Sequence, residues 1–268
     1  MMKRTTKILI GLLLSGFLGS IIGTTLTFLM KKSQVFVMEG KPVQMDLSSF
    51  RVLAVSVESD GKLKKSNLWF SNDLTVLPAQ SGKNVLTFPA DMRKFLSVVM
   101  KNDTLLLSFK MLQQNLPDAY KRRNWMTVAF SGFTLSADSL LATVDSRDVN
   151  MLLRLKKREA DSLTVTASDF VVDSCRLRSL LVPYANKMNL EKSCIANLYL
   201  DLDGMWKWNV NNCEIENEHL TGSKSHNNQL NKGECRRVYW KPKEKDAQLN
   251  IQLNEECCLL LKGEENDN

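Results

Sequence analysis

The chain has 268 residues, of which 44% are apolar and 24% charged, enough for one large or two ordinary domains and unlike a disordered or collagen-like chain. The formal net charge of +7 is typical of nucleic-acid-binding proteins, but five basic residues and no acid lie in the first 32 positions. The rest of the chain holds all 29 acidic side chains and a nearly equal number of basic ones, and this balance excludes the basic surface that nucleic-acid binding needs.

An uncharged stretch, residues 8–30, follows three basic residues and ends at Lys31 and Lys32. As a helix rising about 1.5 Å per residue it is roughly 35 Å long, enough to cross a hydrocarbon core of about 30 Å. We therefore expect residues 1–33 to form a signal anchor with one transmembrane helix. A cleaved signal peptide is the alternative, because small residues at 19–24 offer a cleavage site. Either way we expect the following domain in the periplasm or outside the cell.

Small residues recur every four positions within this span, at Gly11, Ser15, Gly19, Gly23 and Thr27. Such a small-residue face lets two membrane helices approach closely and associate by packing, which predicts a homodimer through the transmembrane helix. The alternative is that the glycines have no role in association, since glycine is common in membrane helices.

Beyond the span, apolar residues alternate or form short runs with little helical periodicity, which predicts an all-β fold. Within a β-rich first part of the ectodomain, residues 34–160, we expect strands over 50–57, 74–77, 85–88, 95–100 and 104–109. Residues 110–123 have the pattern of a short helix limited by Pro117, and 149–157 fit either a helix or a strand.

A repeat follows, in which Cys175, Cys194 and Cys213 recur at an equal spacing and each follows a small polar residue. If each motif is a strand, the cysteines form one inward column and mostly charged residues face outward. This period predicts a β-solenoid, or β-helix-like, domain over 161–262 with coils of about 19–22 residues, followed by an acidic tail at 263–268. The cysteine ladder is expected to hold free thiols, with disulfides between coils as the alternative.

No metal site or cofactor is expected, because the chain has no C-x-x-C pair and just two histidines, His219 and His226. The segment 201–204, Asp-Leu-Asp-Gly, lacks further calcium ligands and predicts a polar turn at a strand end. The sequence has no G-x-S-x-G, G-x-G-x-x-G or P-loop motif, so we expect no enzyme.

Three tryptophans close to the repeat, Trp206, Trp208 and Trp240, fit either aromatic stacking inside the solenoid, which we expect, or a sugar-stacking surface. The basic runs 121–123 and 156–158 are short, and we expect them to be solvated surface.

The strand block 50–57, the segment 99–107 and the repeat motifs 193–200 and 212–223 resemble the head GIN-domain family of auto-transporter adhesins, known from bacterial envelopes. The resemblance covers about residues 45–262 and implies a β-helical envelope protein without established catalytic residues. The sequence as a whole predicts a membrane-anchored, exported β-solenoid that acts as a structural or adhesin-like module with a protein or glycan partner. The alternative is a carbohydrate-binding or carbohydrate-cleaving β-helix protein.

Overall fold

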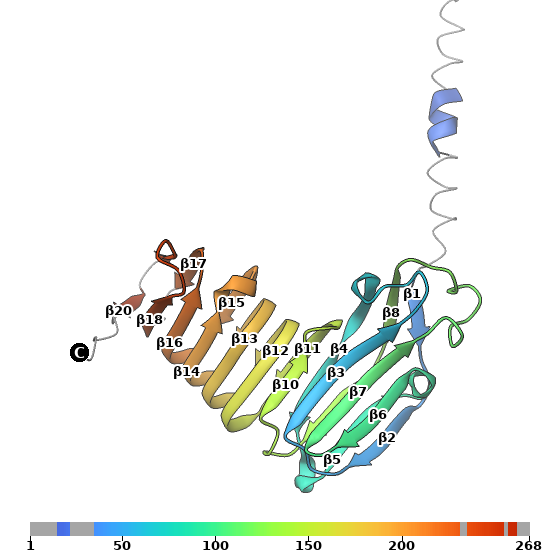
Figure 1. Cartoon of the computed structure of the whole chain (residues 1–268), viewed down its shortest axis with the longest axis horizontal. Coiled ribbons are helices and arrows are strands. Elements are labelled where there is room, and N and C mark those ends of the chain that lie inside the picture. The colour runs from blue at the N-terminus through green and yellow to red at the C-terminus, as the bar shows by residue number, and fades with distance from the viewer. Residues whose placement is uncertain (1–14, 22–34, 231–234, 255–256, 262–268) are drawn as a thin grey trace, which may run out of the picture.

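The protein is mostly β, as predicted, in a computed structural model that describes residues 15–21, 35–230, 235–254 and 257–261 (Figure 1). The first strands are β1 (Val35–Met38), β2 (Pro42–Leu47), β3 (Val52–Ser59), β4 (Leu68–Pro78), β5 (Asn84–Pro89), β6 (Leu96–Lys101), β7 (Thr104–Met111), β8 (Met126–Phe130) and β9 (Thr134–Ala137). The later strands are β10 (Thr143–Ser146), β11 (Asn150–Lys156), β12 (Glu159–Asp173), β13 (Arg176–Glu191), β14 (Cys194–Asp201), β15 (Lys207–Asn211), β16 (Glu214–Gly222), β17 (Ser225–Leu230), β18 (Cys235–Pro242), β19 (Gln248–Leu253) and β20 (Cys258–Leu261). Short 3-10 helices are η1 (Lys65–Asn67), η2 (Gln80–Gly82), η3 (Ala90–Lys94) and η4 (Leu202–Gly204).

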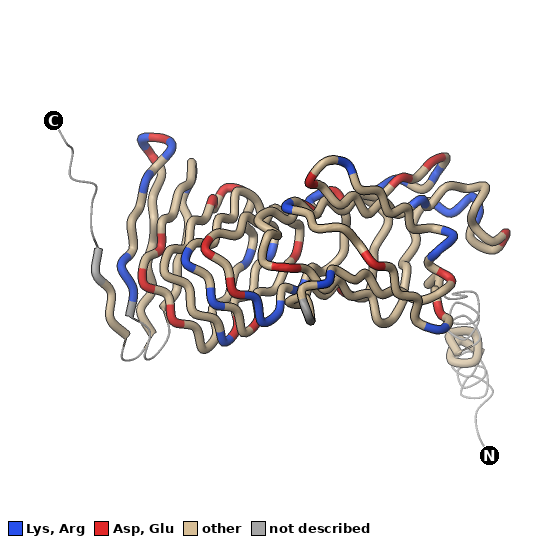
Figure 2. The backbone as a smooth tube through the Cα atoms, turned by 90° about the horizontal axis from the view of Figure 1, so that it is seen from below, with Lys and Arg blue, Asp and Glu red and all other residues tan. Residues whose placement is uncertain are grey.

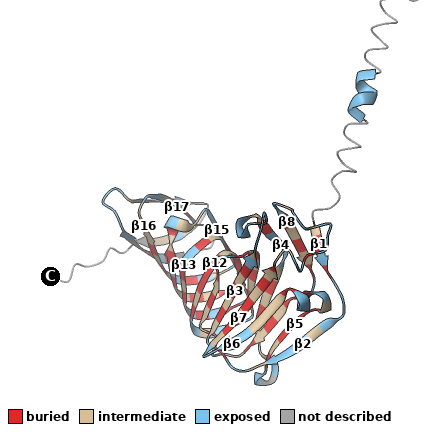
Figure 3. Cartoon of the chain, turned by 45° about the vertical axis from the view of Figure 1, so that its right-hand side comes forward, coloured by how far each residue is buried: buried red, intermediate tan, exposed pale blue. Residues whose placement is uncertain are grey.

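All five strands expected in the first part are present, because alternating apolar residues place one face of each strand against the core. In β3, Leu53, Val55 and Val57 are buried while their neighbours are at least partly exposed. Figure 3 shows the same alternation of buried and exposed positions along the other strands. The segment 110–123 forms turns after β7 ends and contains no helix, and β11 settles 149–157 as a strand.

Parallel pairing links the two parts of the chain without interruption. β3 lies between β7 and β10, and β10 pairs in turn with β12. From β12 the ladder continues through β13, β14, β16, β18 and β20 toward the C-terminal end of the molecule (Figure 1). Antiparallel pairs occur in the first part, where β2 and β9 flank β5 and β6 borders β7. One hydrophobic core runs through both parts, so the later strands extend the core of the earlier ones.

The later strands repeat with a nearly constant offset between paired positions. The pairs that begin successive steps are Glu159 with Arg176, Arg176 with Cys194, Cys194 with Glu214, Asn217 with Arg237, and Cys235 with Cys258. A left-handed backbone corner precedes each of β12, β13, β14 and β16, with φ of 53°, 57°, 49° and 53° at Lys157, Ser174, Lys192 and Asn212. This conformation is strained for residues other than glycine, so its recurrence marks one repeated turn of the chain.

The residues after these corners form a corner column: Arg158, Cys175, Ser193 and Cys213. The backbone N–H of Arg158 donates to Sγ of Cys175 at 3.4 Å, and that of Cys175 donates to Oγ of Ser193 at 3.0 Å. The N–H of Ser193 donates to Sγ of Cys213 at 3.4 Å. The side chains of Cys175, Ser193 and Cys213 therefore each accept the corner N–H of the preceding turn, which the β ladder leaves without a carbonyl partner.

The expected single cysteine column is thus divided. Cys175 and Cys213 belong to the corner column with Ser193 between them, whereas Cys194 lies one position later, on the outward side of β14. The reason is the spacing of the left-handed corners at Ser174, Lys192 and Asn212: the first two are closer together in the sequence than the last two. Because the cysteines are equally spaced and the corners are not, the middle cysteine falls one residue beyond the corner position. Cys175 and Cys194 are both unbridged thiols.

Arg158 corrects the expectation that the run 156–158 is solvated surface. Its side chain is 2% exposed, and its guanidinium donates to the carbonyl oxygens of Ala137 and Asp138 at 2.9 and 2.7 Å. The position is buried because it is the first residue of the corner column, and its long side chain reaches back to the end of β9. Arg158 therefore ties the first part of the fold to the stacked strands.

Residues 15–21 are helical and exposed, and they include Ser15 and Gly19 of the predicted small-residue face. Gly11, Gly23 and Thr27 lie outside the described residues, as does most of the predicted span. Within the described ranges, no helix has the length and apolar character that crossing a membrane requires.

Candidate functional site

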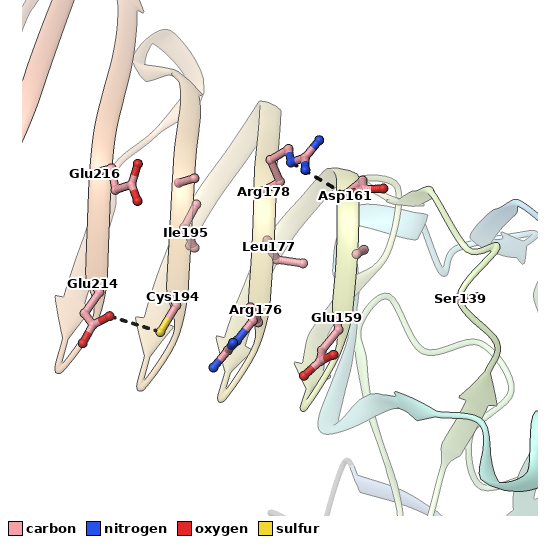
Figure 4. A pocket seen from close by; sticks show the side chains of 12 residues that line it. Ser139, Glu159, Asp161, Arg176, Leu177, Arg178, Cys194, Ile195, Glu214 and Glu216 are labelled. Carbon is pink, nitrogen blue, oxygen red and sulfur yellow. Dashed lines mark hydrogen bonds and ion pairs between the residues drawn. The ribbon is translucent and has the colours of Figure 1, made fainter.

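Two surface features of the stacked strands are candidates for a functional site. The first, which we call the charged groove, carries its side chains in bands, one band per strand: Glu159 and Asp161 on β12, Arg176 and Arg178 on β13, Cys194 and Ala196 on β14, and Glu214 and Glu216 on β16 (Figure 4). The in-register parallel ladder places Arg176 opposite Cys194, and Cys194 opposite Glu214. The residues between them, such as Leu177, Ile195 and Ile215, point into the core.

Short side chains on β14 give the charged groove its shape. Cys194 and Ala196 form the floor, the two arginines form one wall, and the two glutamates of β16 form the other. Neighbouring strands are about 4.8 Å apart, so the backbones of the two walls are about 10 Å apart. The groove has a volume of about 850 Å³, and Ser139, which follows β9, lies at its end near β12.

The charges in the groove are mainly open to solvent. Nε of Arg178 lies 3.7 Å from Oδ1 of Asp161, but the two side chains are 75% and 89% exposed, so this ion pair contributes little to stability. Sγ of Cys194 donates to Oε2 of Glu214 at 3.5 Å. Partial burial raises the pKa of the Cys194 thiol, and the Glu214 carboxylate raises it further. The thiol is thus held protonated and is a poor nucleophile.

The second feature, which we call the amide cleft, lies between β15 and the pair formed by β17 and β19, and has a volume of about 670 Å³. Seven of its lining residues have amide side chains: Asn209, Asn211, Asn227, Asn228, Gln229, Asn250 and Gln252. Trp206 and Trp208 also line it. The two candidate sites therefore differ in chemistry. The charged groove is lined by long side chains of opposite charge, whereas the amide cleft is lined mainly by neutral hydrogen-bonding groups and indole rings.

Hydrogen bonds between neighbouring amides hold parts of the cleft in place. Nδ2 of Asn209 donates to Oδ1 of Asn189 at 2.9 Å on one side, and Nδ2 of Asn250 donates to Oδ1 of Asn227 at 3.3 Å on the other. Each amide has two N–H donors and a carbonyl acceptor, so these bonds leave further groups for a ligand.

The tryptophans divide between core and surface. Trp208 and Trp240 agree with one part of the expectation, a place inside the stack, because both pack partly against the core. The expected stacking differs, since the Trp240 ring meets His226 edge-on with centroids 6.3 Å apart. Trp206 contradicts the expectation, because its side chain is 74% exposed, with Nζ of Lys187 5.0 Å from its ring centroid. The residue occupies the corner before β15, where the strand alternation that would turn it inward has not begun.

An aromatic ladder on the outer surface escaped the sequence analysis. The rings of Tyr199, His219 and Tyr239 stack with centroid distances of 4.4 and 4.7 Å. The three residues occupy paired positions on β14, β16 and β18, and their equal spacing along the chain was the signal that could have revealed them. Burial lowers the pKa of His219, so the ring is neutral between its two neighbours at neutral pH.

The segment 201–204 forms a polar turn at the end of β14, as predicted. Asp201 accepts the backbone N–H of Asp203 at the start of η4. Nζ of Lys243 donates to both carboxylates, at 2.6 and 2.8 Å, so one ammonium bridges the pair and offsets one of its two negative charges. The hydrogen bond from Lys243, with others from Ser223, holds the pKa of Asp203 far below its usual range. In the described part of the chain, no three potential ligands from histidine, cysteine, aspartate or glutamate converge as they would around a metal ion.

Comparison with known proteins gives a loose structural likeness to solved structures. No protein-family model and no curated protein matches the chain. A solved structure of a candidate adhesin from Bacteroides fragilis is 12% identical, with a TM-score of 0.44 over 85% of this chain and 99% of that one. A candidate lipid-binding protein from Parabacteroides distasonis is 7% identical, with a TM-score of 0.39 over 84% and 99%. A candidate adhesin from Parabacteroides merdae is 11% identical, with a TM-score of 0.36 over 86% and 98%. Likeness this loose carries no argument about function, and the resemblance to the head GIN-domain family remains an expectation.

Proposed function

We propose that this protein is a membrane-anchored, exported β-solenoid that serves a bacterial cell envelope as a non-catalytic, adhesin-like interaction module. The observation that carries the proposal is the separation of carboxylates from aromatic rings on the stacked strands. Among the described lining residues, the charged groove has four carboxylates and no aromatic side chain, whereas the amide cleft has two tryptophans and no carboxylate. A carbohydrate-cleaving enzyme needs a carboxylate pair at the site that holds the sugar, so the arrangement supports binding rather than cleavage.

The solenoid interpretation rests on the pairing of the later strands. Each strand of the ladder from β12 onward pairs in parallel with the next, and the stretch of chain between paired positions has a similar length each time. The same left-handed corner recurs before β12, β13, β14 and β16, so we take each such stretch as one coil. Coils stacked in this way expose long, flat, polar surfaces. Figure 2 shows acidic and basic residues interleaved along these coils.

The charged groove is the surface that we assign to a protein partner. A partner segment with a carboxylate and an ammonium or guanidinium group on opposite sides would meet Arg176 and Arg178 on one wall and Glu214 and Glu216 on the other. Opposite charges on facing walls also fix the direction in which such a segment lies, because the reversed orientation places like charges together.

A charge-reversal experiment tests this assignment. The double variant Arg176→Glu with Arg178→Glu makes both walls acidic, and its side chains are exposed, so we expect unchanged folding and at least a tenfold loss of adherence to the partner surface in a cell-adhesion assay. Lys62→Glu with Lys64→Glu, in the exposed turn before η1, is the matched control. Equal adherence of both double variants and the wild type would contradict the assignment.

Export and anchoring are tested by cell fractionation and protease accessibility of the full chain. The basic residues on both sides of the uncharged segment support the anchor. We expect the protein in the membrane fraction, with residues after 35 digested once the outer membrane is permeabilised. A soluble chain, or one protected from protease until the inner membrane is opened, would contradict the proposed location.

Association through the small-residue face is a further part of the proposal. Gly19→Ile with Gly23→Ile widens the closest approach of two helices, so we expect self-association in a membrane reporter assay to fall to background. Leu18→Ile with Ile22→Leu preserves volume and leaves the face intact, and serves as the control. An unchanged signal in the glycine double variant would exclude this dimer.

A further inference from the structure

The ladder of the stacked strands opens on one side of the molecule. β14 pairs with β16 and β16 with β18, so this side is continuous from coil to coil. On the side of β15 the pattern differs, because β15 pairs with β13 whereas β17 pairs with β19 in a separate two-stranded sheet. No pairing joins β15 to β17 among the described strands, and the amide cleft occupies the opening between them.

The edges of this opening present ordered hydrogen-bonding groups. The backbones of β15 and β17 have donors and acceptors on the sides where a neighbouring strand would otherwise pair. Asn209 and Asn227 are each held by an amide from the strand behind, at 2.9 and 3.3 Å. The cleft is therefore lined on both sides by neutral groups that combine a donor with an acceptor, like the hydroxyl groups of a sugar.

The alternation along β17 separates one inward amide from two outward ones. Asn228 is 1% exposed, and its Nδ2 donates to Oε2 of the buried Glu218 at 2.9 Å. This bond fixes the orientation of the amide. Its Oδ1 accepts no hydrogen bond from the described residues. Asn227 and Gln229, on either side of Asn228 in β17, are exposed, so these two amides are the ones that offer hydrogen bonds to a ligand in the cleft.

The indole rings add the other half of the recognition chemistry. Trp206 is 74% exposed at the rim, and Lys187 lies against its ring and restricts its orientation. Trp208, partly buried, contacts the core at the inner end of the cleft. An exposed, oriented indole offers a flat apolar surface for the C–H face of a pyranose ring, whose hydroxyl groups would then meet the amides.

We propose that the amide cleft binds a neutral glycan. The charge of the lining indicates the class of ligand. Lys207 is the one charged residue among the described lining residues, so the cleft has too little charge to complement a polyanion or a cationic peptide. Apart from the indoles, Val210 and Ile251 are its apolar lining residues, too few for the alternating side-chain pockets that strand addition of a peptide uses. The inference rests on the proposed non-catalytic role of the stack, since this lining holds no carboxylate to cleave the glycan.

Affinity electrophoresis of the full chain tests the proposal, in gels containing mannan, dextran, mixed-linkage β-glucan or xylan, with a detergent that contains no sugar. We expect retardation in at least one of these gels. Trp206→Ala removes the stacking surface and is expected to weaken the apparent affinity about tenfold or more, and Gln229→Ala about threefold to tenfold. Trp69→Ala, on β4, is the matched control, because Trp69 is also exposed but lies far along the fold.

The outcomes separate the glycan from its rivals. Retardation that Trp206→Ala reduces and Trp69→Ala leaves within twofold would support the cleft. No retardation in any gel, retardation insensitive to Trp206→Ala, or Trp206-dependent binding of extended peptides instead of glycans would overturn it. Release of reducing ends from a retarding polysaccharide would refute the non-catalytic role while leaving glycan recognition intact. Binding without the release of reducing ends supports both.

Discussion

Arg158→Met tests whether one buried cation joins the two parts of the fold. The guanidinium donates two hydrogen bonds to the carbonyl oxygens of Ala137 and Asp138, at 2.9 and 2.7 Å, inside a site where the side chain is 2% exposed. Methionine fills most of the same volume without a donor. Both carbonyl groups would then lose their charged partner at the point where β9 ends.

The size of the effect follows from these bonds. A hydrogen bond from a charged donor contributes about 1.5–3 kcal/mol, so the loss of two costs about 3–6 kcal/mol. The variant also avoids burying a guanidinium whose Nε has no acceptor among the described residues, which offsets part of that loss. Burial lowers the pKa of Arg158, while nearby Cys175 and Asp138 oppose that shift. We expect a net destabilisation of about 2–4 kcal/mol.

Thermal unfolding of the full chain followed by circular dichroism measures the change. At about 2–4 °C per kcal/mol for a chain of this order of size, the midpoint is expected to fall by about 4–16 °C. Arg147→Met is the control, because Arg147 pairs with Asp145 at the exposed surface and its removal costs about 0.5 kcal/mol or less. Equal midpoints for Arg158→Met and Arg147→Met would refute the reasoning.

Three further predictions concern the stacked strands. Glu214→Gln lowers the pKa of Cys194 and is expected to speed alkylation of its thiol by iodoacetamide at pH 8 roughly twofold or more, whereas Arg176→Gln is expected to slow it. Peptide mass spectrometry measures both rates. Equal rates in the two variants would exclude electrostatic coupling of Cys194 to these residues. Because the folded pKa of His219 is depressed, its contribution to stability is complete above pH 6.5 and is lost as the pH falls through the folded pKa. His219→Phe should reduce the change in the unfolding midpoint between pH 7 and pH 5. A midpoint that varies with pH as much as in the wild type would contradict this. Ser193→Cys should preserve the corner column, whereas Ser193→Val is expected to cost about 1–3 kcal/mol in denaturant unfolding; similar losses in both would argue against the hydrogen bonds at this corner.

Local patterns predicted the strands well because half-buried strands leave a direct mark on the sequence. The alternation in 50–57 and 104–109 corresponds to β3 and β7, whose inward residues are buried. The pattern over 110–123 was less informative: it allows a short helix, but the segment folds into turns, with the N–H of Gln113 bonded to Asp60 and that of Arg122 bonded to Gln113. Those contacts come from tertiary structure and from turn chemistry, neither of which has a helical or strand period.

The repeat shows where spacing alone becomes unreliable. Cys175, Cys194 and Cys213 are equally spaced, yet the step between the first two corners is shorter than the next, so Cys194 moves from the corner onto an outward strand position. A shift of one residue changes the face on which a strand residue lies. Lengths of individual turns therefore decide which residues share a column, and an average period does not contain them.

The amide cleft depends on tertiary structure to a greater extent. Each amide is ordinary along the chain, and Asn209, Asn227 and Asn250 meet because β15, β17 and β19 line the same cleft. The exposure of Trp206 likewise depends on the corner that precedes β15. The sequence signal for the cleft was the cluster of tryptophans near 206, whose surface role was the less favoured of two interpretations.

By itself, the sequence determined the strand-rich character of the chain, the regular repeat of its later part and the concentration of excess positive charge before residue 33, because hydrophobic period and charge are properties of neighbouring residues. The tertiary structure alone decided that Arg158 is buried, that Cys194 faces outward and that the ladder opens at β15. The physical reason is that register between strands depends on the length of every intervening turn, and burial depends on which strands that register brings together.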